Sequence, residues 1–334
     1  VEGGHSEERS ESLSGGEMAM EVEGGGGVVP QCFQEPVDWT GFEHGEHLPP
    51  PPHSSGEVYR ARHGGSGFEC VFKVLVIPIP NAQDIQPVIQ GIKEAWNGPV
   101  GTHPGICALY GCTYDAPNHR VVVATEFMDG LSLRDHMRPG RPIPERVVGS
   151  VVSQLVDVLA FLHSQWHRAH RDLKPGNILL NRKGEVKVTD LGQSRQLQAT
   201  LEQMSSFVGT QQYMSPQRIQ GATYTSGCDV WSLGLIAQQC ILGEFPYDAV
   251  LRERNETDPS IDIMIQLMEE GPPPPLPAGF GAEAREFCRV AMEFDDTQRP
   301  SSRALLEHPF VVGCADRQPL GGWVAESLAH MGRA

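Results

Sequence analysis

The 334-residue chain has little positive charge, with 26 lysines and arginines against 42 aspartates and glutamates and a formal net charge of −16. A protein that binds nucleic acid through a basic face needs the opposite balance, so we expect no nucleic-acid partner. No uninterrupted apolar run reaches 18 residues, and we therefore expect no membrane span. The eight cysteines include no CxxC pair, so neither a disulfide framework nor a zinc site is predicted.

The acidic charge is concentrated at the N-terminus. Residues 1–50 hold eleven acidic side chains and one basic one, Arg9, together with the run Gly24–Gly27. Such a segment cannot bury enough apolar surface to offset the entropy lost on ordering. We therefore predict that residues 1–47 form a disordered, acidic, glycine-rich leader, which is either a solvating tail or an interaction tail.

Strand-like sequences precede helix-like ones. Residues 71–77 and 120–124 are rich in β-branched side chains and predict strands. Helices are expected around residues 230–236 and from residue 261 to just before Gly271. A longer helix is indicated by apolar residues at helical spacing: Val147, Val148, Val151, Val152, Leu155, Val156, Leu159 and Leu162. Strands followed by helices favour the α+β class.

The strongest chemical signal is the sequence HRDLKPGN at residues 170–177, followed thirteen residues later by Asp190-Leu191-Gly192. Phosphoryl transfer needs a carboxylate that orients the attacking hydroxyl, and Asp172 suits that role. It also needs a cation that steadies the transferred group, for which Lys174 is the candidate. Asn177 and Asp190 offer the hard oxygen ligands that Mg²⁺ prefers.

These motifs resemble those of eukaryotic protein kinases, and the resemblance extends over residues 48–311. It implies a bilobal protein kinase-like fold, with a small β-rich N-lobe at about 48–127 and a larger helical C-lobe at about 128–311. Residues 312–334 would then form a C-terminal tail. The cofactors that the resemblance implies are ATP and Mg²⁺.

The resemblance also assigns roles to further residues. Lys73 matches the lysine that pairs with the α- and β-phosphates, and Glu94 matches its glutamate partner on the next helix. Thr125 falls at the gatekeeper position. The other residues that it places around ATP are Ser54, Ser55, Gly56, Val58, Val71, Glu126, Met128 and Leu179. Three residues are expected to support the catalytic loop and the helical lobe: Arg171, Asp229 and Arg299.

The segment at residues 206–216 resembles the FVGTxxYMSPE stretch of mitogen-activated protein kinase kinases. Five residues separate Thr200 from Ser206, which is the spacing of the activation sites in the plant-type members. Arg171 is the expected partner of a phosphate on this loop. Lys174, two residues after the catalytic aspartate, accompanies serine or threonine acceptors in similar kinases.

The expected function is therefore that of a mitogen-activated protein kinase kinase. Such an enzyme phosphorylates threonine and tyrosine, or serine and threonine, of a downstream mitogen-activated protein kinase. It is switched on by an upstream activating kinase. We expect it in the cytoplasm, with the nucleus as an alternative.

Four departures from the family pattern stand out in the sequence. Only Gly56 remains of the glycine-rich loop, which predicts a poorer phosphate cover. Val71 replaces the alanine above adenine and narrows that slot. Gly98 stands where a large apolar residue is usual. Gln217 replaces a glutamate, so its contact with Arg299 would lose a charge-assisted hydrogen bond.

Two alternatives remain open at this point. A pseudokinase or scaffold would keep the fold and bind cascade partners without transferring phosphate. A general serine/threonine kinase outside the cascade is also compatible, because residues 1–47 lack the basic cluster followed by LxL that the kinase kinases often carry.

Overall fold

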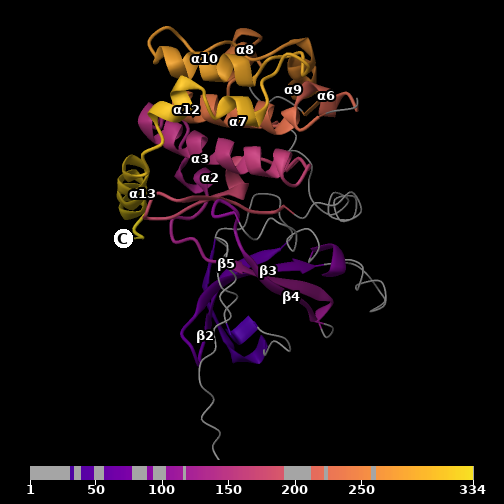
Figure 1. Cartoon of the computed structure of the whole chain (residues 1–334), viewed down its shortest axis with the longest axis vertical. Helices are drawn as coiled ribbons and strands as arrows, with labels where there is room; N and C mark the ends of the chain where they lie inside the picture. Colours follow the sequence, from indigo (N-terminus) through magenta and orange to yellow (C-terminus); the bar gives the residue numbers. More distant parts are fainter. Residues whose placement is uncertain are drawn as a thin grey trace, which may run out of the picture.

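The computed structural model describes residues 31–33, 39–48, 56–76, 89–92, 103–115, 118–191, 212–221, 225–256 and 261–333. The predictions made for Ser54, Ser55, Glu94, Gly98, Thr200 and Ser206 lie outside these ranges. A β-sheet and a larger group of helices form two lobes, joined by the segment that follows the last sheet strand (Figure 1). The α+β class and the bilobal protein kinase-like fold predicted from the sequence are confirmed.

The N-lobe is built around one antiparallel sheet with the strand order β1-β2-β3-β5-β4. The strands are β1 (Phe42–His47), β2 (Glu57–His63), β3 (Glu69–Val76), β4 (Leu109–Asp115) and β5 (Arg120–Glu126). Lys73 pairs with Val58 on one side and Val123 on the other, while Val71 pairs with Thr125. Because opposed residues share a face and alternate residues return to it, these five side chains lie on one face of the sheet.

The two faces of this sheet support separate apolar clusters. Val121 and Val123 pack with Ile92 on the face that carries Lys73. The opposite face carries an aromatic cluster that includes Tyr59 and Phe72. The alternation of side chains along β5 divides the N-lobe core in this way.

The aromatic cluster corrects the predicted extent of the leader. Phe33 and Phe42 are buried in it, although both lie within residues 1–47. The Phe33 ring stacks on Tyr110 with centroids 5.3 Å apart, and Trp39 packs on Phe72 at 5.7 Å. Acidic composition concealed these few aromatic residues, each of which buries a large apolar area.

The C-lobe is a group of helices packed around α3 and α7 (Figure 1). Its helices are α2 (Leu133–His136), α3 (Glu145–Ser164), α6 (Pro216–Ile219), α7 (Gly227–Leu242), α8 (Asp248–Glu253), α9 (Ile261–Glu270), α10 (Ala282–Ala291), α11 (Ser302–Leu305), α12 (Pro309–Gly313) and α13 (Gln318–His330). The predicted helices correspond to α3, α7 and α9. The short strands β6 (Ile178–Leu180) and β7 (Val186–Val188) pair with each other beside the catalytic loop.

Helix α3 is long and apolar enough to cross a membrane by length and composition. Of its most apolar stretch, 67% is nevertheless buried inside the fold. Leu155 and Leu159 are fully enclosed by the C-lobe. This pattern is that of a core helix.

The segment predicted as a C-terminal tail contains an ordered helix. Helix α13 runs along one side of the C-lobe and buries Leu320, Val324 and Leu328 (Figure 1). The side chain of Ser327 is 2.7 Å from Nδ1 of His136 on α2. Burial of an apolar stripe attaches α13 to the lobe, so it is part of the folded structure.

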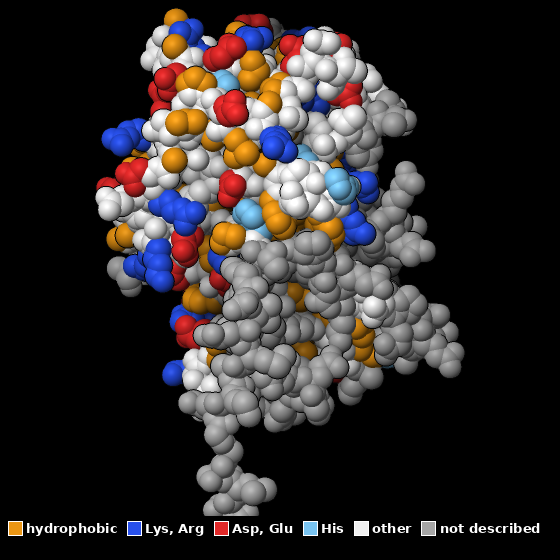
Figure 2. Space-filling view, viewed as in Figure 1, with side chains coloured by type: hydrophobic (Ala, Val, Ile, Leu, Met, Phe, Trp, Pro, Cys, Tyr) orange, Lys and Arg blue, Asp and Glu red, His pale blue; other side chains and the backbone are white. Residues whose placement is uncertain are grey.

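Charged side chains are interspersed on the face of the C-lobe seen in Figure 2. Several exposed charged side chains of the C-lobe form local ion pairs, such as Arg252 with Glu244 and Arg289 with Glu286. Among the described residues of this face, the net negative charge is therefore not gathered into one continuous patch.

Candidate active site

The catalytic loop is held by Asp229, a fully buried residue in the first turn of α7. Its carboxylate accepts hydrogen bonds from the backbone N–H of His170 at 2.7 Å and of Arg171 at 2.9 Å. Nε2 of His163 lies 2.8 Å from the same carboxylate. Burial by itself raises the pKa of Asp229, but the hydrogen bond and charge of His163 outweigh burial and keep the pKa below its ordinary value.

His170 connects the catalytic loop to the strand that precedes Asp190. Its Nδ1 accepts a hydrogen bond from the backbone N–H of Asp172, which leaves Nε2 to donate to the Thr189 carbonyl at 3.0 Å. The Thr189 N–H in turn donates to the carbonyl of Asn177. These bonds fix the position of the catalytic loop relative to the segment that carries Asp190.

Asp172, Lys174 and Asn177 converge at the centre of this loop. The Lys174 ammonium lies 3.0 Å from Oδ2 of Asp172. The Asn177 amide donates to the same oxygen at 2.9 Å and to the Asp172 carbonyl at 2.8 Å. Both Asp172 and Asn177 are buried, so these contacts orient the carboxylate before any substrate arrives.

Asp190 brings the N-lobe and the C-lobe together. Both of its carboxylate oxygens accept hydrogen bonds from the Lys73 ammonium, at 2.9 and 2.8 Å. Burial raises the pKa of Asp190, but the charge and hydrogen bond of Lys73 outweigh burial, and the net pKa lies below its usual value. The carboxylate is therefore ionised at neutral pH and available to a metal ion.

Two residues of the site have left-handed backbone conformations that side chains rarely adopt. Arg171 has φ 69° and Asp190 has φ 63°. Neither is a glycine, so the surrounding hydrogen bonds must hold these conformations against their intrinsic cost. Strain of this kind is concentrated at functional sites.

The residues predicted to surround the adenine lie where the two lobes meet. Val58 and Val71 come from the sheet face that carries Lys73, and both are half-buried. Met128 is buried in the connecting segment, and Leu179 on β6 bridges to Ser132. The register of the sheet and the β6 bridge thus bring these four predicted residues to the boundary between the lobes.

Glu126, which the sequence places beside ATP, also uses its side chain to hold the end of β5. Its carboxylate pairs with the Lys187 ammonium at 2.8 Å and accepts a hydrogen bond from the Ala108 N–H. The Glu126 N–H donates to the Ala108 carbonyl, and the Cys107 thiol lies 3.6 Å from the Glu126 carbonyl. These contacts fix the end of β5, from which the connecting segment departs.

The one glycine that remains of the phosphate-covering loop is required by the sheet itself. A Cβ atom at Gly56 would lie 2.1 Å from the carbonyl oxygen of Val74 on β3. A side chain is therefore excluded at Gly56 because its backbone lies close to the neighbouring strand β3. From the sequence, we had attributed this glycine to close contact between the loop backbone and phosphate.

The oxygen atoms of the site fit a magnesium ion. Oδ1 of Asn177 is buried and has no hydrogen-bond partner within the described part of the chain. The Asp190 carboxylate supplies a second, ionised oxygen donor. No cluster of three or more His, Cys, Asp or Glu residues was found in the ranges described. Mg²⁺ commonly binds through one or two carboxylates while keeping phosphate and water ligands, so two protein donors suffice.

Within the described ranges, the hydrogen-bond acceptors of Arg299 are neutral groups. It is buried over the face of Trp231, 5.2 Å from the ring centroid, and donates to the carbonyls of Glu293 and Gly227. Its contact with Gln217 is 3.3 Å long, which matches the neutral hydrogen bond expected from the sequence. Burial lowers the pKa of Arg299.

Several residues that support the site were not found from the sequence. One of them is His163, which contacts both Asp229 and Ser302. Lys187 and Arg218 also escaped notice; the Arg218 guanidinium donates to the carbonyl of Arg171. Their partners are 47 to 139 residues away in sequence, so no local pattern could have indicated them.

Comparison with known proteins is consistent with this geometry. The family described as "Protein kinase domain" matches residues 54–311. Mitogen-activated protein kinase kinase 2 of Arabidopsis thaliana is 36% identical over 259 residues, covering 77% of this chain and 69% of the relative. Kinase kinases 3 and 1 of the same plant are 37% and 39% identical, covering 63% and 62% of this chain.

The chain spans 39% and 58% of the lengths of those last two relatives. The matched region nevertheless includes both lobes and every described residue of the site. The chain therefore belongs to the protein kinase family and, within it, resembles the mitogen-activated protein kinase kinases in sequence across most of its length.

Proposed function

We propose that this protein transfers the γ-phosphoryl group of ATP to hydroxyl side chains of a downstream mitogen-activated protein kinase. The observation that carries the proposal is the joining of the two lobes at one point. Lys73 of the sheet contacts Asp190 of the C-lobe at 2.8 Å, close to the group formed by Asp172, Lys174 and Asn177. Phosphoryl transfer depends mainly on such positioning and charge stabilisation.

Each residue has a defined task in this reaction. Asp172 orients the acceptor hydroxyl and accepts its proton, as the oxygen–phosphorus bond forms and the bond to the ADP oxygen breaks. Lys174 neutralises charge on the transferred group, and Lys73 binds the α- and β-phosphates. Asn177 and Asp190 would hold Mg²⁺, which when bound offsets the negative charge of the phosphates.

Regulation by an upstream kinase is part of the proposal. Phosphorylation of Thr200 and Ser206 would place negative charge near Arg171 and order the segment between Asp190 and Tyr213. The support is the way in which Arg171 is held. Asp229 binds its N–H and Arg218 binds its carbonyl, so its guanidinium is presented from a fixed backbone.

Phosphate transfer to a kinase-dead mitogen-activated protein kinase tests the proposal. We expect transfer by the wild type or by the Thr200→Glu/Ser206→Glu form. Asp172→Asn should lower kcat by about 10³-fold, because loss of a general base typically costs 10² to 10⁴. Lys73→Met should also abolish most activity, whereas the exposed substitution Asp262→Asn on α9 serves as a control and should have no effect.

Nucleotide binding separates the remaining alternatives. A thermal shift with Mg²⁺-ATP but no transfer to any protein would indicate a nucleotide-binding pseudokinase. Neither shift nor transfer would favour a scaffold, and the proposal would then be wrong. Transfer to generic serine peptides, but none to the kinase-dead substrate, would indicate a serine/threonine kinase outside the cascade.

A further inference from the structure

A pocket of about 350 Å³ opens beside the catalytic loop. Its walls come from α2 and the segment that leads to α3, from Pro175 in the catalytic loop, from Tyr213, and from the end of α7 with the turn to α8. None of the residues that line it belongs to the site for ATP and Mg²⁺ described above. The pocket is therefore separate from that site.

Three arginines gather at this pocket: Arg134, Arg138 and Arg141. All three are exposed, and within the described ranges none of them forms an ion pair with a carboxylate. Some exposed arginines of the C-lobe do have such partners, as Arg254 has in Glu270, whereas others, such as Arg303, have none among the described residues. In a chain with a net charge of −16, three such guanidinium groups around one pocket indicate a place for an anion.

The acidic residues in the lining are already engaged. Glu244 is paired with Arg252 through two hydrogen bonds at 2.8 and 2.9 Å. Asp248 accepts a hydrogen bond from the Phe245 N–H, and burial raises its pKa. Neither carboxylate therefore neutralises the three arginines.

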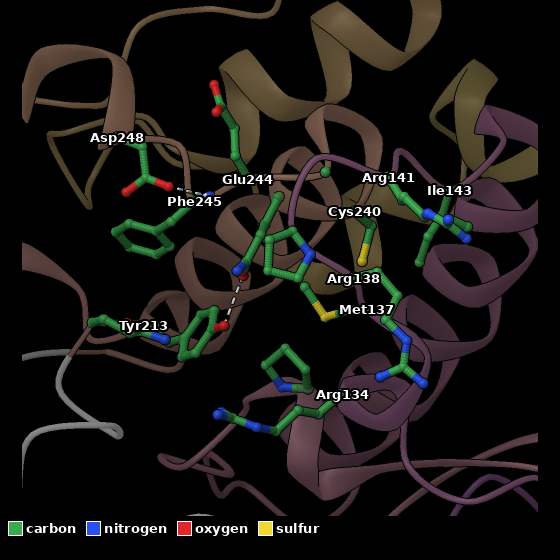
Figure 3. Close-up of a pocket in the computed structure, with 15 residues that line it drawn as sticks. Arg134, Met137, Arg138, Arg141, Ile143, Tyr213, Cys240, Glu244, Phe245 and Asp248 are labelled. Atoms are coloured by element: carbon green, nitrogen blue, oxygen red, sulfur yellow. Dashed lines mark hydrogen bonds between the residues drawn. The ribbon is translucent and has the colours of Figure 1, made fainter. Parts of the chain in front are cut away.

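The floor of the pocket is apolar and fixed. The Tyr213 hydroxyl donates to Gln239 at 2.7 Å, and its ring meets Phe245 edge-on with centroids 6.1 Å apart. In Figure 3, Arg134 runs below Tyr213, while Arg138 and Arg141 lie on the other side of the pocket. An apolar floor with cationic edges suits a peptide segment that carries a negatively charged side chain.

The distance from the catalytic aspartate defines where on a substrate that side chain would lie. Pro175 lines the pocket and is three residues from Asp172, so their Cα atoms are at most about 11 Å apart. An extended peptide advances about 3.3 Å per residue, so this span corresponds to three or four residues. A substrate whose hydroxyl lies at Asp172 can therefore reach the pocket with a nearby residue.

We propose that this pocket selects protein substrates with an acidic side chain, a carboxylate or a phosphate, within about five residues of the phosphoacceptor. The inference rests on the proposed kinase function and adds a preference in substrate sequence. Arg134 and Arg138 are positioned to bind the acidic group, with Arg141 adding to the local positive charge. The apolar floor contacts the backbone and the stem of the same side chain.

A positional set of peptides tests the preference. Each peptide has one threonine acceptor in a neutral background, with a single glutamate, glutamine or phosphoserine placed at one position from five residues before to five after. Phosphate transfer gives KM and kcat, and fluorescence anisotropy without ATP gives the affinity of the full chain for the same peptides. The comparison of glutamate with phosphoserine distinguishes carboxylate from phosphate recognition.

At one or two adjacent positions, glutamate should lower KM about fivefold relative to glutamine, as expected for an exposed charge pair, with kcat unchanged. The difference should shrink in 0.5 M salt, because exposed charges are screened. In the double variant Arg134→Ala/Arg138→Ala, the difference in KM between the glutamate and glutamine peptides should fall below twofold, while the KM of the glutamine peptide stays unchanged. The control is Arg303→Ala, an exposed arginine on α11 outside the pocket, and it should keep the preference.

Two results would overturn the inference. One is equal binding of glutamate and glutamine peptides at every position by the wild type. The other is an equal loss for both peptides in the double variant, which would indicate a structural role of the arginines. If no peptide or protein is phosphorylated at all, the proposed function fails, but the anisotropy measurement still reports whether the pocket prefers acidic peptides.

Discussion

The two lobes bury their apolar side chains differently. The C-lobe has one continuous cluster in which α3 and α7 are enclosed, and residues such as Leu159 and Leu233 are wholly inaccessible. The N-lobe has two smaller clusters separated by its sheet. Helices can surround one another, whereas each face of a sheet needs a cover of its own.

The covers of the sheet come from segments outside the strands. Ile92 packs on one face, and Phe33 and Trp39 pack on the other. The small lobe therefore depends on a few large side chains at its edges, while the C-lobe distributes the same task over many helices. Substitutions in the two lobes should differ in cost for this reason.

The largest effect is expected from removing a buried phenylalanine in either lobe. Phe287 on α10 and Phe72 on β3 are both buried, so Phe287→Ala and Phe72→Ala delete the same atoms. We expect a loss of about 4–5 kcal/mol for Phe287 and about 3 kcal/mol for Phe72. The enclosed C-lobe site has less freedom to collapse around the cavity. Chemical denaturation would measure both, and equal or reversed costs would contradict the contrast between the lobes.

The aromatic cover of the N-lobe can be tested at Phe33. Its ring lies 5.0 Å from Phe42 and stacks on Tyr110. Phe33→Ala should lower the free energy of unfolding by about 2–3 kcal/mol, at or below the low end for buried aromatic residues. Glu43→Gln, an exposed change on β1, serves as the control. A negligible effect of Phe33→Ala would support the prediction from the sequence that residues 1–47 form a disordered leader.

The attachment of α13 to the C-lobe should depend on pH. Burial lowers the pKa of His136, with the hydrogen bond to Gly130 and the charge of Asp135 opposing it only in part. At a pH between the lowered pKa of the folded chain and the ordinary pKa of the unfolded chain, His136 binds a proton in the unfolded chain but not in the folded one. Stability from the neutral ring is therefore present above about pH 6.5 and is lost as the pH falls below it.

Thermal unfolding between pH 8 and pH 5.5 would measure this dependence. The slope from one histidine is at most about 1.4 kcal/mol per pH unit. His136→Gln should reduce the decline at low pH, leaving the part due to His103 and His308, whose pKa values burial also lowers. An unchanged pH profile in this variant would show that His136 is not the titrating group.

The smallest expected effect is a gain in stability at Gln217. The Gln217→Glu substitution would place a carboxylate beside the buried Arg299, which now contacts a neutral amide at 3.3 Å. A charge-assisted hydrogen bond is stronger than a neutral one, so we expect a gain of about 1 kcal/mol. Gln220→Glu, an exposed change in the same segment, is the control. A loss of stability would mean that the cost of burying the carboxylate exceeds the gain.

Residue order along the chain was enough to predict the reactive groups and the main helices. The spacing of Asp172, Lys174, Asn177 and Asp190 indicated phosphoryl transfer because these residues are close in sequence. The apolar stripe of α3 likewise repeats within one helix. Both signals come from residues that are close in sequence, so they can be recognised without the structure.

Contacts between distant segments could be known only from the folded chain. Lys73 and Asp190 are 117 residues apart, and His136 meets Ser327 across 191 residues. The three arginines of the pocket look like ordinary surface residues until α2, α7 and the catalytic loop pack around one space. Motifs of neighbouring residues identify the chemical groups of the site. The packing of helices and strands decides which charged side chains lie close to one another.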